Sequence, residues 1–171
     1  AIPAYRVLNP GLAAAGQPAP EALKGLARMG FRTVVNLRPE KEGLPDERAV
    51  VEAQGLRYVS IPFTAETFSL ADVEAIERVL DEPSAGPVLL HCASSNRVGG
   101  AWAVIQVRKG KSFEEAEAAG RGAGLPSPAM AVAVRRADLH APRGDRPERD
   151  GRAAAADRLR QHHRPRACAR P

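Results

Sequence analysis

The chain has 171 residues, of which 44% are hydrophobic, 26% are charged and 4% are aromatic. This length suits one domain with a packed core, no apolar run is long enough to cross a membrane, and two cysteines exclude a disulfide framework. The net charge of +5 raises the question of nucleic-acid binding, but 11 arginines and five acidic residues lie within residues 135–171, so residues 1–134 have a net charge of −1.

The first part of the chain contains two strand patterns and one helix pattern. A short strand is predicted at residues 4–8, and a turn-rich link follows at residues 11–18. Apolar residues at helical spacing predict a helix over residues 20–29. The β-branched segment 31–37 is predicted to be a buried strand.

The patterns continue to alternate after a charged loop at residues 38–44. Further strands are predicted at residues 56–63 and 87–91, and further helices at residues 45–54, 70–80, 98–108, 112–122 and 128–136. Strands separated by helices of this length are typical of right-handed βαβ units. We therefore expect an α/β fold with a central, mostly parallel sheet flanked by helices.

The end of the chain differs in composition from the preceding body. After Val134 there is no Val, Ile, Phe, Trp, Tyr or Met, and only Leu139 and Leu159 could pack in a core. Such a segment buries too little apolar surface to offset the entropy of ordering it. We expect a domain over residues 1–136 and a disordered, Arg/Pro/Ala-rich tail over residues 137–171, solvated and without a specific nucleic-acid partner.

A short polar segment between the strand 87–91 and the helix 98–108 contains the candidate site. Cys92 directly follows the strand, and Arg97, whose guanidinium fork matches two oxyanion oxygens, stands at the helix start. Ligands bind at this edge of open α/β sheets, and N–H groups at a helix start attract anions. We expect anion contacts from six residues: Ala93, Ser94, Ser95, Asn96, Arg97 and Val98. Their positive field favours the thiolate of Cys92, which makes this sulfur the candidate nucleophile.

These residues and three earlier motifs resemble a known family. The segment His91-Cys92-Ala-Ser-Ser-Asn-Arg97-Val-Gly resembles the signature loop of bacterial dual-specificity-like protein phosphatases. The motifs at residues 14–18, 30–40 and 55–62 are similar to the phosphatase-like domain that is also attached to β-lactamase-like hydrolases. The resemblance covers residues 4–125 and implies the cysteine-phosphatase fold, with a phosphocysteine intermediate that water hydrolyses.

The loop departs from the usual phosphatase pattern in its length. Four residues separate Cys92 from Arg97, whereas cysteine phosphatases typically have five. Four intervening residues also resemble the active loop of rhodaneses, in which the cysteine carries a persulfide sulfur. Three functions stay open: a phosphatase for phosphotyrosine-type or small phosphoesters, a rhodanese-like sulfurtransferase, and a non-catalytic module that binds phosphorylated ligands.

A phosphatase also needs a general acid for its leaving alcohol. The family resemblance places the acid on the loop after the strand 56–63, where Glu66 is the only ionisable residue. Asp72, in the first turn of the next helix, is the alternative. We expect Arg38 to pair with Glu47 rather than to bind a second phosphate.

The sequence favours a reaction without a cofactor. Three of the four histidines lie in the tail, no ligand spacing fits a metal cluster, and neither a Rossmann nor a P-loop glycine motif is present. The expected partner is a phosphorylated protein or a small phosphoester. The chain starts at Ala1 rather than Met, as a processed or trimmed product would, and we expect a soluble protein of the cytoplasm or the bacterial periplasm.

Overall fold

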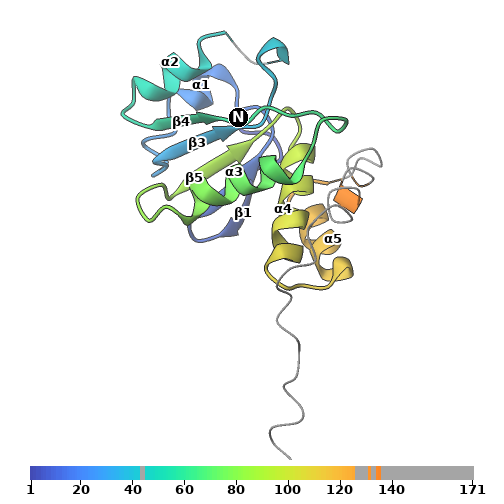
Figure 1. Ribbon diagram of the computed structural model, residues 1–171. Helices are drawn as coiled ribbons and strands as arrows, with labels where there is room; N and C mark the ends of the chain where they lie inside the picture. The colour runs from blue at the N-terminus through green and yellow to red at the C-terminus, as the bar shows by residue number, and fades with distance from the viewer. Residues whose placement is uncertain (43–44, 126–130, 132–133, 136–171) are drawn as a thin grey trace, which may run out of the picture. The chain divides into compact units, whose positions relative to one another are not determined.

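The computed structural model describes residues 1–42, 45–125, 131, 134 and 135 (Figure 1). The five strands are β1 (Arg6–Asn9), β2 (Leu12–Ala15), β3 (Thr33–Asn36), β4 (Arg57–Ser60) and β5 (Val88–His91). The helices are α1 (Pro20–Leu23), α2 (Glu47–Glu52), α3 (Leu70–Asp81), α4 (Asn96–Arg108) and α5 (Phe113–Gly122), with a 3-10 turn η1 (Glu40–Glu42). The strand order is β1-β2-β5-β3-β4, and only the β1–β2 pair is antiparallel among these strands. The expected mostly parallel α/β sheet is therefore confirmed.

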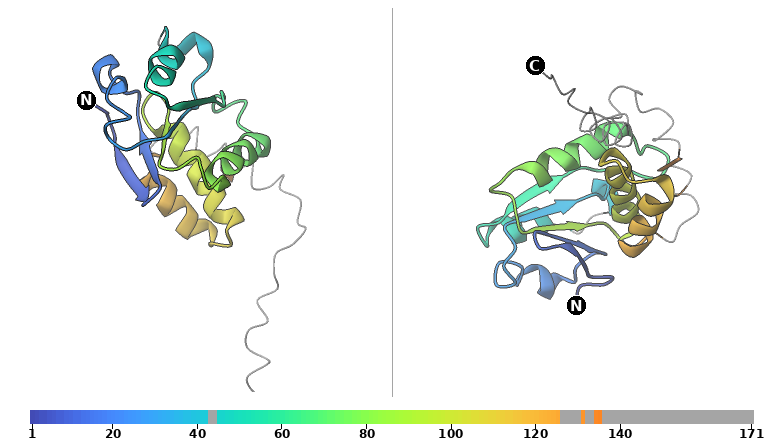
Figure 2. Two further views of the ribbon diagram at one scale, coloured as in Figure 1. Left: turned by 90° about the vertical axis from the view of Figure 1, so that its left-hand side faces the viewer. Right: turned by 90° about the horizontal axis from the view of Figure 1, so that it is seen from below.

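Both faces of the sheet are covered by helices (Figure 2). In the paired strands β3 and β5, Val35 and Leu90 belong to one apolar cluster, whereas Val34 and Leu89 belong to another. The first cluster includes buried residues of α3 and α4, and the second includes residues of α1 and α2. Alternation of side chains along each strand explains this division, because successive residues point to opposite faces.

The strand β5 places the candidate site in the middle of the sheet. It lies between β2 and β3, and the chain passes from its carboxyl end directly into the start of α4. The helix α4 approaches α5 closely, since a Cβ added at Gly99 would lie 2.5 Å from the backbone nitrogen of Leu125. This contact requires glycine and fixes the first turns of α4 against the end of α5.

Two predicted elements are wrong near the N-terminus. The expected link at residues 11–18 contains β2, whose alanine-rich sequence lacks the β-branched residues that mark a strand. The helix predicted at residues 20–29 ends at Leu23, and the backbone that follows is held by the side chain of Gln54. That amide donates to the carbonyl of Leu23 at 2.6 Å and accepts from the N–H of Ala27 at 3.2 Å. These bonds replace those that a longer helix would supply.

The remaining predicted elements agree in kind with the structure and differ at their ends. The helix predicted at residues 98–108 begins two residues earlier, at Asn96. The predicted helix 128–136 falls mostly outside the described residues, and the predicted tail 137–171 falls entirely outside them.

Candidate active site

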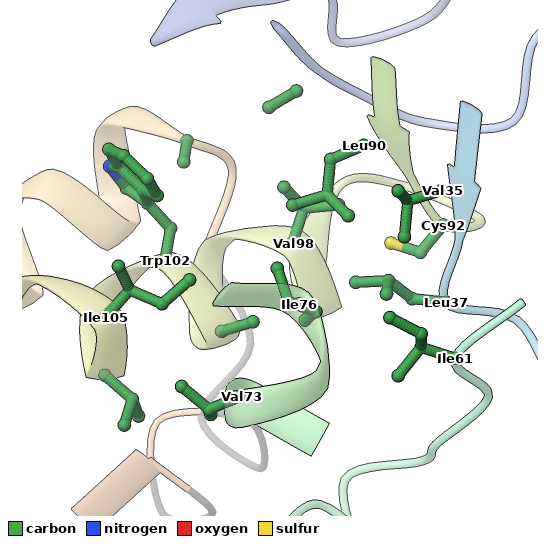
Figure 3. Packing of buried hydrophobic residues seen from close by; sticks show 14 of the residues in the cluster. Val35, Leu37, Ile61, Val73, Ile76, Leu90, Cys92, Val98, Trp102 and Ile105 are labelled. Atoms are coloured by element: carbon green, nitrogen blue, oxygen red, sulfur yellow. The ribbon is translucent and has the colours of Figure 1, made fainter. Parts of the chain in front are cut away.

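Cys92 lies at the carboxyl end of β5 and is 1% exposed. Its side chain belongs to the apolar cluster between the sheet and the helices α3 and α4, together with Val35, Leu37 and Val98 (Figure 3). Apolar side chains cannot stabilise a negative charge on the sulfur. The stabilisation that a thiolate needs must therefore come from the polar side, where residues 92–97, here termed the cysteine loop, turn into α4.

Ser95 holds the end of the cysteine loop against the residues that follow α5. Its backbone has a left-handed conformation with φ of 70°, its side chain is buried, and its Oγ donates to the carbonyl of Ala123 at 2.8 Å. Gly124 lies against it, since a Cβ at that position would approach the Ser95 Cβ to 2.7 Å. The turn at Ser95 starts α4 at Asn96, earlier than the sequence predicts. Because the Ser95 hydroxyl donates to Ala123, the backbone N–H is the donor of Ser95 that can contact an anion.

The start of the cysteine loop is held by the N-terminal segment. The backbone N–H of Gln17 donates to the carbonyl of Ala93 at 3.0 Å, and Gly16 forms an isolated antiparallel bridge with Ser94. A Cβ at Gly16 would lie 2.9 Å from the Ala93 oxygen, so this approach requires glycine. Ala93 and Ser94 are exposed at the edge of the sheet, where a ligand can reach them.

Arg97 lies in the first turn of α4 with 15% of its side chain exposed. One guanidinium nitrogen, Nη2, lies 2.5 Å from a carboxylate oxygen of Glu42. The other, Nη1, donates to the carbonyls of Leu37 at 3.4 Å and Phe63 at 3.2 Å. Because a guanidinium has five N–H donors, two remain for the oxygens of an anion.

Two further members of the expected site also belong to α4. Asn96 is half-buried at its first position, and Val98 is buried in the apolar cluster beside Cys92. As with Ser95, the burial of Val98 leaves its backbone rather than its side chain for contact with a ligand.

The two candidate acids have different surroundings. Glu66 is exposed on the loop between β4 and α3, three residues after the Phe63 carbonyl that holds Arg97. Asp72 caps α3, because its carboxylate accepts from the backbone N–H and from the Oγ of Ser69, both at 2.8 Å. The cap gives Asp72 a structural role at the start of α3.

A buried polar network adjoins the site on the α2 side of the sheet. Arg38 donates through Nη1 to Oε1 of Gln17, and Gln17 Nε2 donates to Oε2 of Glu47 at 3.0 Å. The other oxygen of Glu47 lies 2.7 Å from Nε2 of His91, and both side chains are almost completely buried. The predicted Arg38–Glu47 pair is therefore wrong in detail, since the amide of Gln17 stands between the two charges.

The charge of Glu47 is stabilised by this network. Burial alone would raise the pKa of the Glu47 carboxyl. The hydrogen bond and charge of His91, together with Gln17 and Arg38, outweigh burial and hold this pKa below its ordinary value. Glu47 is thus an anion in the interior, beside the residue that precedes Cys92.

A hollow of about 530 Å³ lies where the carboxyl ends of β3 and β4 meet the start of α2. It is lined by Asn36, Arg38, Glu40, Pro45, Asp46, Glu47, Arg48, Tyr58, Ser60 and Pro62. The lining mixes both signs of charge, and Asn36 donates to the hydroxyl of Tyr58 at 2.9 Å.

The sequence alone did not identify Glu42, Gln17 or Glu47 as parts of the site. Glu42 is one of two glutamates in η1, and nothing in the local pattern separates it from Glu40. Glu47 occupies the first turn of α2, where an acidic residue is common for reasons of the helix dipole. Their roles depend on contacts with residues far away in the chain, which no local signal reports.

The described part of the chain gives no sign of a metal centre or a membrane span. Among these residues, no group of three or more His, Cys, Asp or Glu side chains is arranged to hold a metal ion. No helix within the same residues is long and apolar enough to cross a bilayer.

The sheet order, the cysteine at the end of its central strand and the arginine at the following helix start define a phosphatase-like α/β domain. The chain belongs to the family described as beta-lactamase hydrolase-like protein, phosphatase-like domain, whose model matches residues 4–109. It is 31% identical over 142 residues to a beta-lactamase hydrolase-like protein from Xylella fastidiosa (strain Temecula1). That match covers 80% of this chain and 33% of the relative, so the chain spans about a third of the length of this curated relative.

Solved structures support the same assignment. A DUF442 protein from Shewanella putrefaciens CN-32 is 25% identical, with a TM-score of 0.65 over 81% of this chain and 93% of that chain. The structure of P. aeruginosa TpbA in complex with pTyr is 25% identical, with a TM-score of 0.64 over 79% of this chain and 85% of that chain. The expected family and fold are confirmed.

Proposed function

We propose that the chain is a cysteine-dependent phosphatase that acts on a phosphorylated protein or a small phosphoester. The observation that carries the proposal is the placement of Cys92 and Arg97 at the two ends of one short loop, between the central strand and the start of α4. The similar protein TpbA has been solved in complex with pTyr, which supports phosphotyrosine-type substrates.

In the proposed reaction, the Cys92 thiolate attacks phosphorus and forms a sulfur–phosphorus bond while the ester oxygen leaves. Arg97 and the backbone N–H groups of residues 93–98 hold the remaining phosphoryl oxygens, where negative charge is concentrated. Glu66 gives its proton to the leaving alcohol. Water then attacks the phosphocysteine, releases phosphate and restores the thiolate.

The contacts of Arg97 support the role of the loop that contains Glu66. Arg97 binds the Phe63 carbonyl at the start of this loop, so the loop and the guanidinium occupy the same edge of the sheet. A carboxylic acid three residues further along can fold toward a substrate held by Arg97. No other ionisable residue stands between Phe63 and Ser69.

A second candidate is sulfur transfer, which the four-residue spacing between Cys92 and Arg97 favours. Here the thiolate would attack the outer sulfur of thiosulfate, the sulfur–sulfur bond would break, and sulfite would leave. The persulfide on Cys92 would then pass its outer sulfur to an acceptor thiol. A transferred sulfur atom is smaller than a phosphoryl group and suits a shorter loop.

One pair of assays separates the candidates. Wild-type protein and Cys92→Ser are compared for hydrolysis of an aryl phosphate and of a phosphotyrosine peptide, and for sulfur transfer from thiosulfate. We expect hydrolysis by the wild type alone, because a serine hydroxyl without an adjacent base is a weak nucleophile. Persulfide on Cys92 with untouched phosphoesters would establish the second candidate. Peptide binding without turnover in either assay would indicate a non-catalytic module.

A further inference from the structure

Three side-chain and backbone contacts close a ring around the first residues of the cysteine loop. The backbone N–H of Gln17 holds the Ala93 carbonyl at 3.0 Å, and the side chain of Gln17 donates to Glu47 at 3.0 Å. Glu47 in turn lies 2.7 Å from the imidazole of His91. The chain from His91 through Cys92 to Ala93 completes the ring, so the backbone of Cys92 is part of it, while the Cys92 side chain points to the opposite face of the sheet.

The burial of two charged or polar members of this ring, Glu47 and His91, indicates a specific role. Glu47 is 3% exposed and His91 is inaccessible to solvent, and charged residues are rarely buried so completely unless they are paired. Gln17 is itself held, since its carbonyl oxygen accepts from Arg38. The side-chain amide of Gln17 is therefore oriented with its oxygen toward Arg38 and its nitrogen toward Glu47. It links the segment after β2 to the start of α2, which are distant in the sequence.

The other end of the cysteine loop has separate supports. Ser95 is bonded to the carbonyl of Ala123 at the end of α5, and Arg97 is bonded to Glu42 in η1. Neither of these contacts involves Gln17 or Glu47. The loop thus has one set of supports at the nucleophile and another at the guanidinium that would bind the anion.

We propose that Gln17 and Glu47 are positioning residues that hold Cys92 in the geometry needed for attack, through His91 on one side and Ala93 on the other. The proposal rests on the proposed function for its kinetic consequences. Because the anion is held mainly by the other end of the loop, loss of this link should change the rate of the chemical step more than it changes substrate binding.

The kinetic test compares Glu47→Gln with Glu52→Gln on the same helix. Glu52 is exposed and lies 3.2 Å from the guanidinium of Arg48 on the same helix, so it serves as the matched control. Glu47→Gln keeps the shape of the side chain but places a second amide against that of Gln17. We expect kcat for an aryl phosphate to fall about tenfold with KM unchanged within about twofold, because small misplacements of reacting atoms cost this much or more.

A double-variant cycle tests whether Gln17 and Glu47 act as one link. Gln17→Ala should give a similar loss of kcat, and the double variant should lose no more than the larger single loss. Independent, multiplicative losses would overturn the link. Gln17→Ala also keeps the inference testable if Glu47→Gln fails to fold, because Gln17 is only half-buried.

A measurement that does not depend on phosphatase activity separates this inference from the proposed function. Iodoacetate carries a carboxylate for the anion site, and the Cys92 thiolate displaces its iodide to form a carbon–sulfur bond, which peptide mass analysis locates. We expect the limiting alkylation rate of Glu47→Gln to fall about tenfold at an unchanged half-saturating concentration.

The outcomes are distinct. Slower alkylation in a protein whose wild type hydrolyses no phosphoester would refute the proposed function and keep the positioning role. A lower melting temperature with unchanged kcat and alkylation would show that Glu47 is only structural. A rise in KM without a fall in kcat would place the link at the anion end, and the inference would be wrong.

Discussion

His91 and Cys92 are neighbours in the sequence, yet they belong to opposite faces of the sheet. Cys92 packs in the apolar cluster of α3 and α4, whereas His91 contacts Glu47 of α2 in a polar network. Both side chains are buried, with exposed fractions of 1% and 0%. The Cys92 side chain is packed among apolar side chains, whereas the His91 imidazole lies 2.7 Å from the Glu47 carboxylate.

This difference shows how the cysteine loop, a short segment of small polar residues, can be held in one conformation. Packing restrains the volume that the Cys92 side chain occupies, but it does not set the direction of the backbone at Cys92. The contacts of Glu47 and Gln17 set the direction of the chain that enters the loop, and Arg97 with its partners sets the exit.

The largest effect is expected from Arg97→Lys. The charge is kept, but a lysine ammonium cannot replace the planar fork that contacts Glu42, Leu37 and Phe63. We expect kcat/KM on an aryl phosphate to fall roughly 10²-fold or more, with weaker inhibition by vanadate. Arg108→Lys, on the exposed end of the same helix, is the control and should keep full activity. Equal activities of the two variants would show that Arg97 does not touch the anion.

A smaller and substrate-dependent effect is expected from Glu66→Gln. If Glu66 protonates the leaving oxygen, hydrolysis of an alkyl phosphate should slow about 10²-fold, while hydrolysis of an aryl phosphate with a stable leaving phenolate should change little. The ratio of the two rates is the measurement, and Glu21→Gln at a distant exposed position is the control. An equal loss on both substrates would mean that Glu66 only shapes the loop, and no loss on either would leave Asp72 or water as the proton donor.

Local sequence predicted the parts of the site that are local in the chain. Cys92 and Arg97 stand five residues apart on one strand–loop–helix unit, so the strand pattern and the helix start were enough to place them at the two ends of one loop. Glu42 and Glu47 reach the site only because β3 and β5 pair in parallel, which places the chain after β3 beside the chain after β5. Sheet pairing of this kind is not encoded in any short segment.

The sequence also misjudged the strand β2, for a related reason. Its four residues, Leu12–Ala15, are all buried because β1 and β5 pair on either side of it. Alanine has little strand preference of its own, so the sequence of β2 shows no recognisable strand pattern. The small alanine side chains instead suit a crowded position between two paired strands. Tertiary burial decided this element, whereas the β-branched segment of β3 was evident from the sequence.

On the polar face, we expect the stabilisation by Glu47 to depend on pH. The pKa of Glu47 is lowered in the folded state from its ordinary value of 4.5, so its contribution to the free energy of unfolding is present above that value and is lost as the pH falls through the folded-state pKa. Glu47→Gln should cost about 3 kcal/mol near pH 7, and this difference from the wild type should shrink in acid. Melting curves from about pH 7 to about pH 3 provide the measurement. A difference that stays constant with pH would contradict the charged role, and Glu52→Gln should show little difference throughout.

The smallest effect is expected from deletion of residues 137–171. Both faces of the sheet already have their own helices, and among the described residues only Tyr5, Val7 and Met29 are exposed large hydrophobic side chains. The deleted segment offers only Leu139 and Leu159 for apolar contact, which is too little to offset the entropy of ordering it. We expect the melting temperature to change by less than about 2 °C and kcat to stay unchanged. A loss of several degrees would show that the segment packs on the domain, and a loss of kcat without a loss of stability would show that it contributes to the site; either result would contradict the expectation that two covered faces are sufficient.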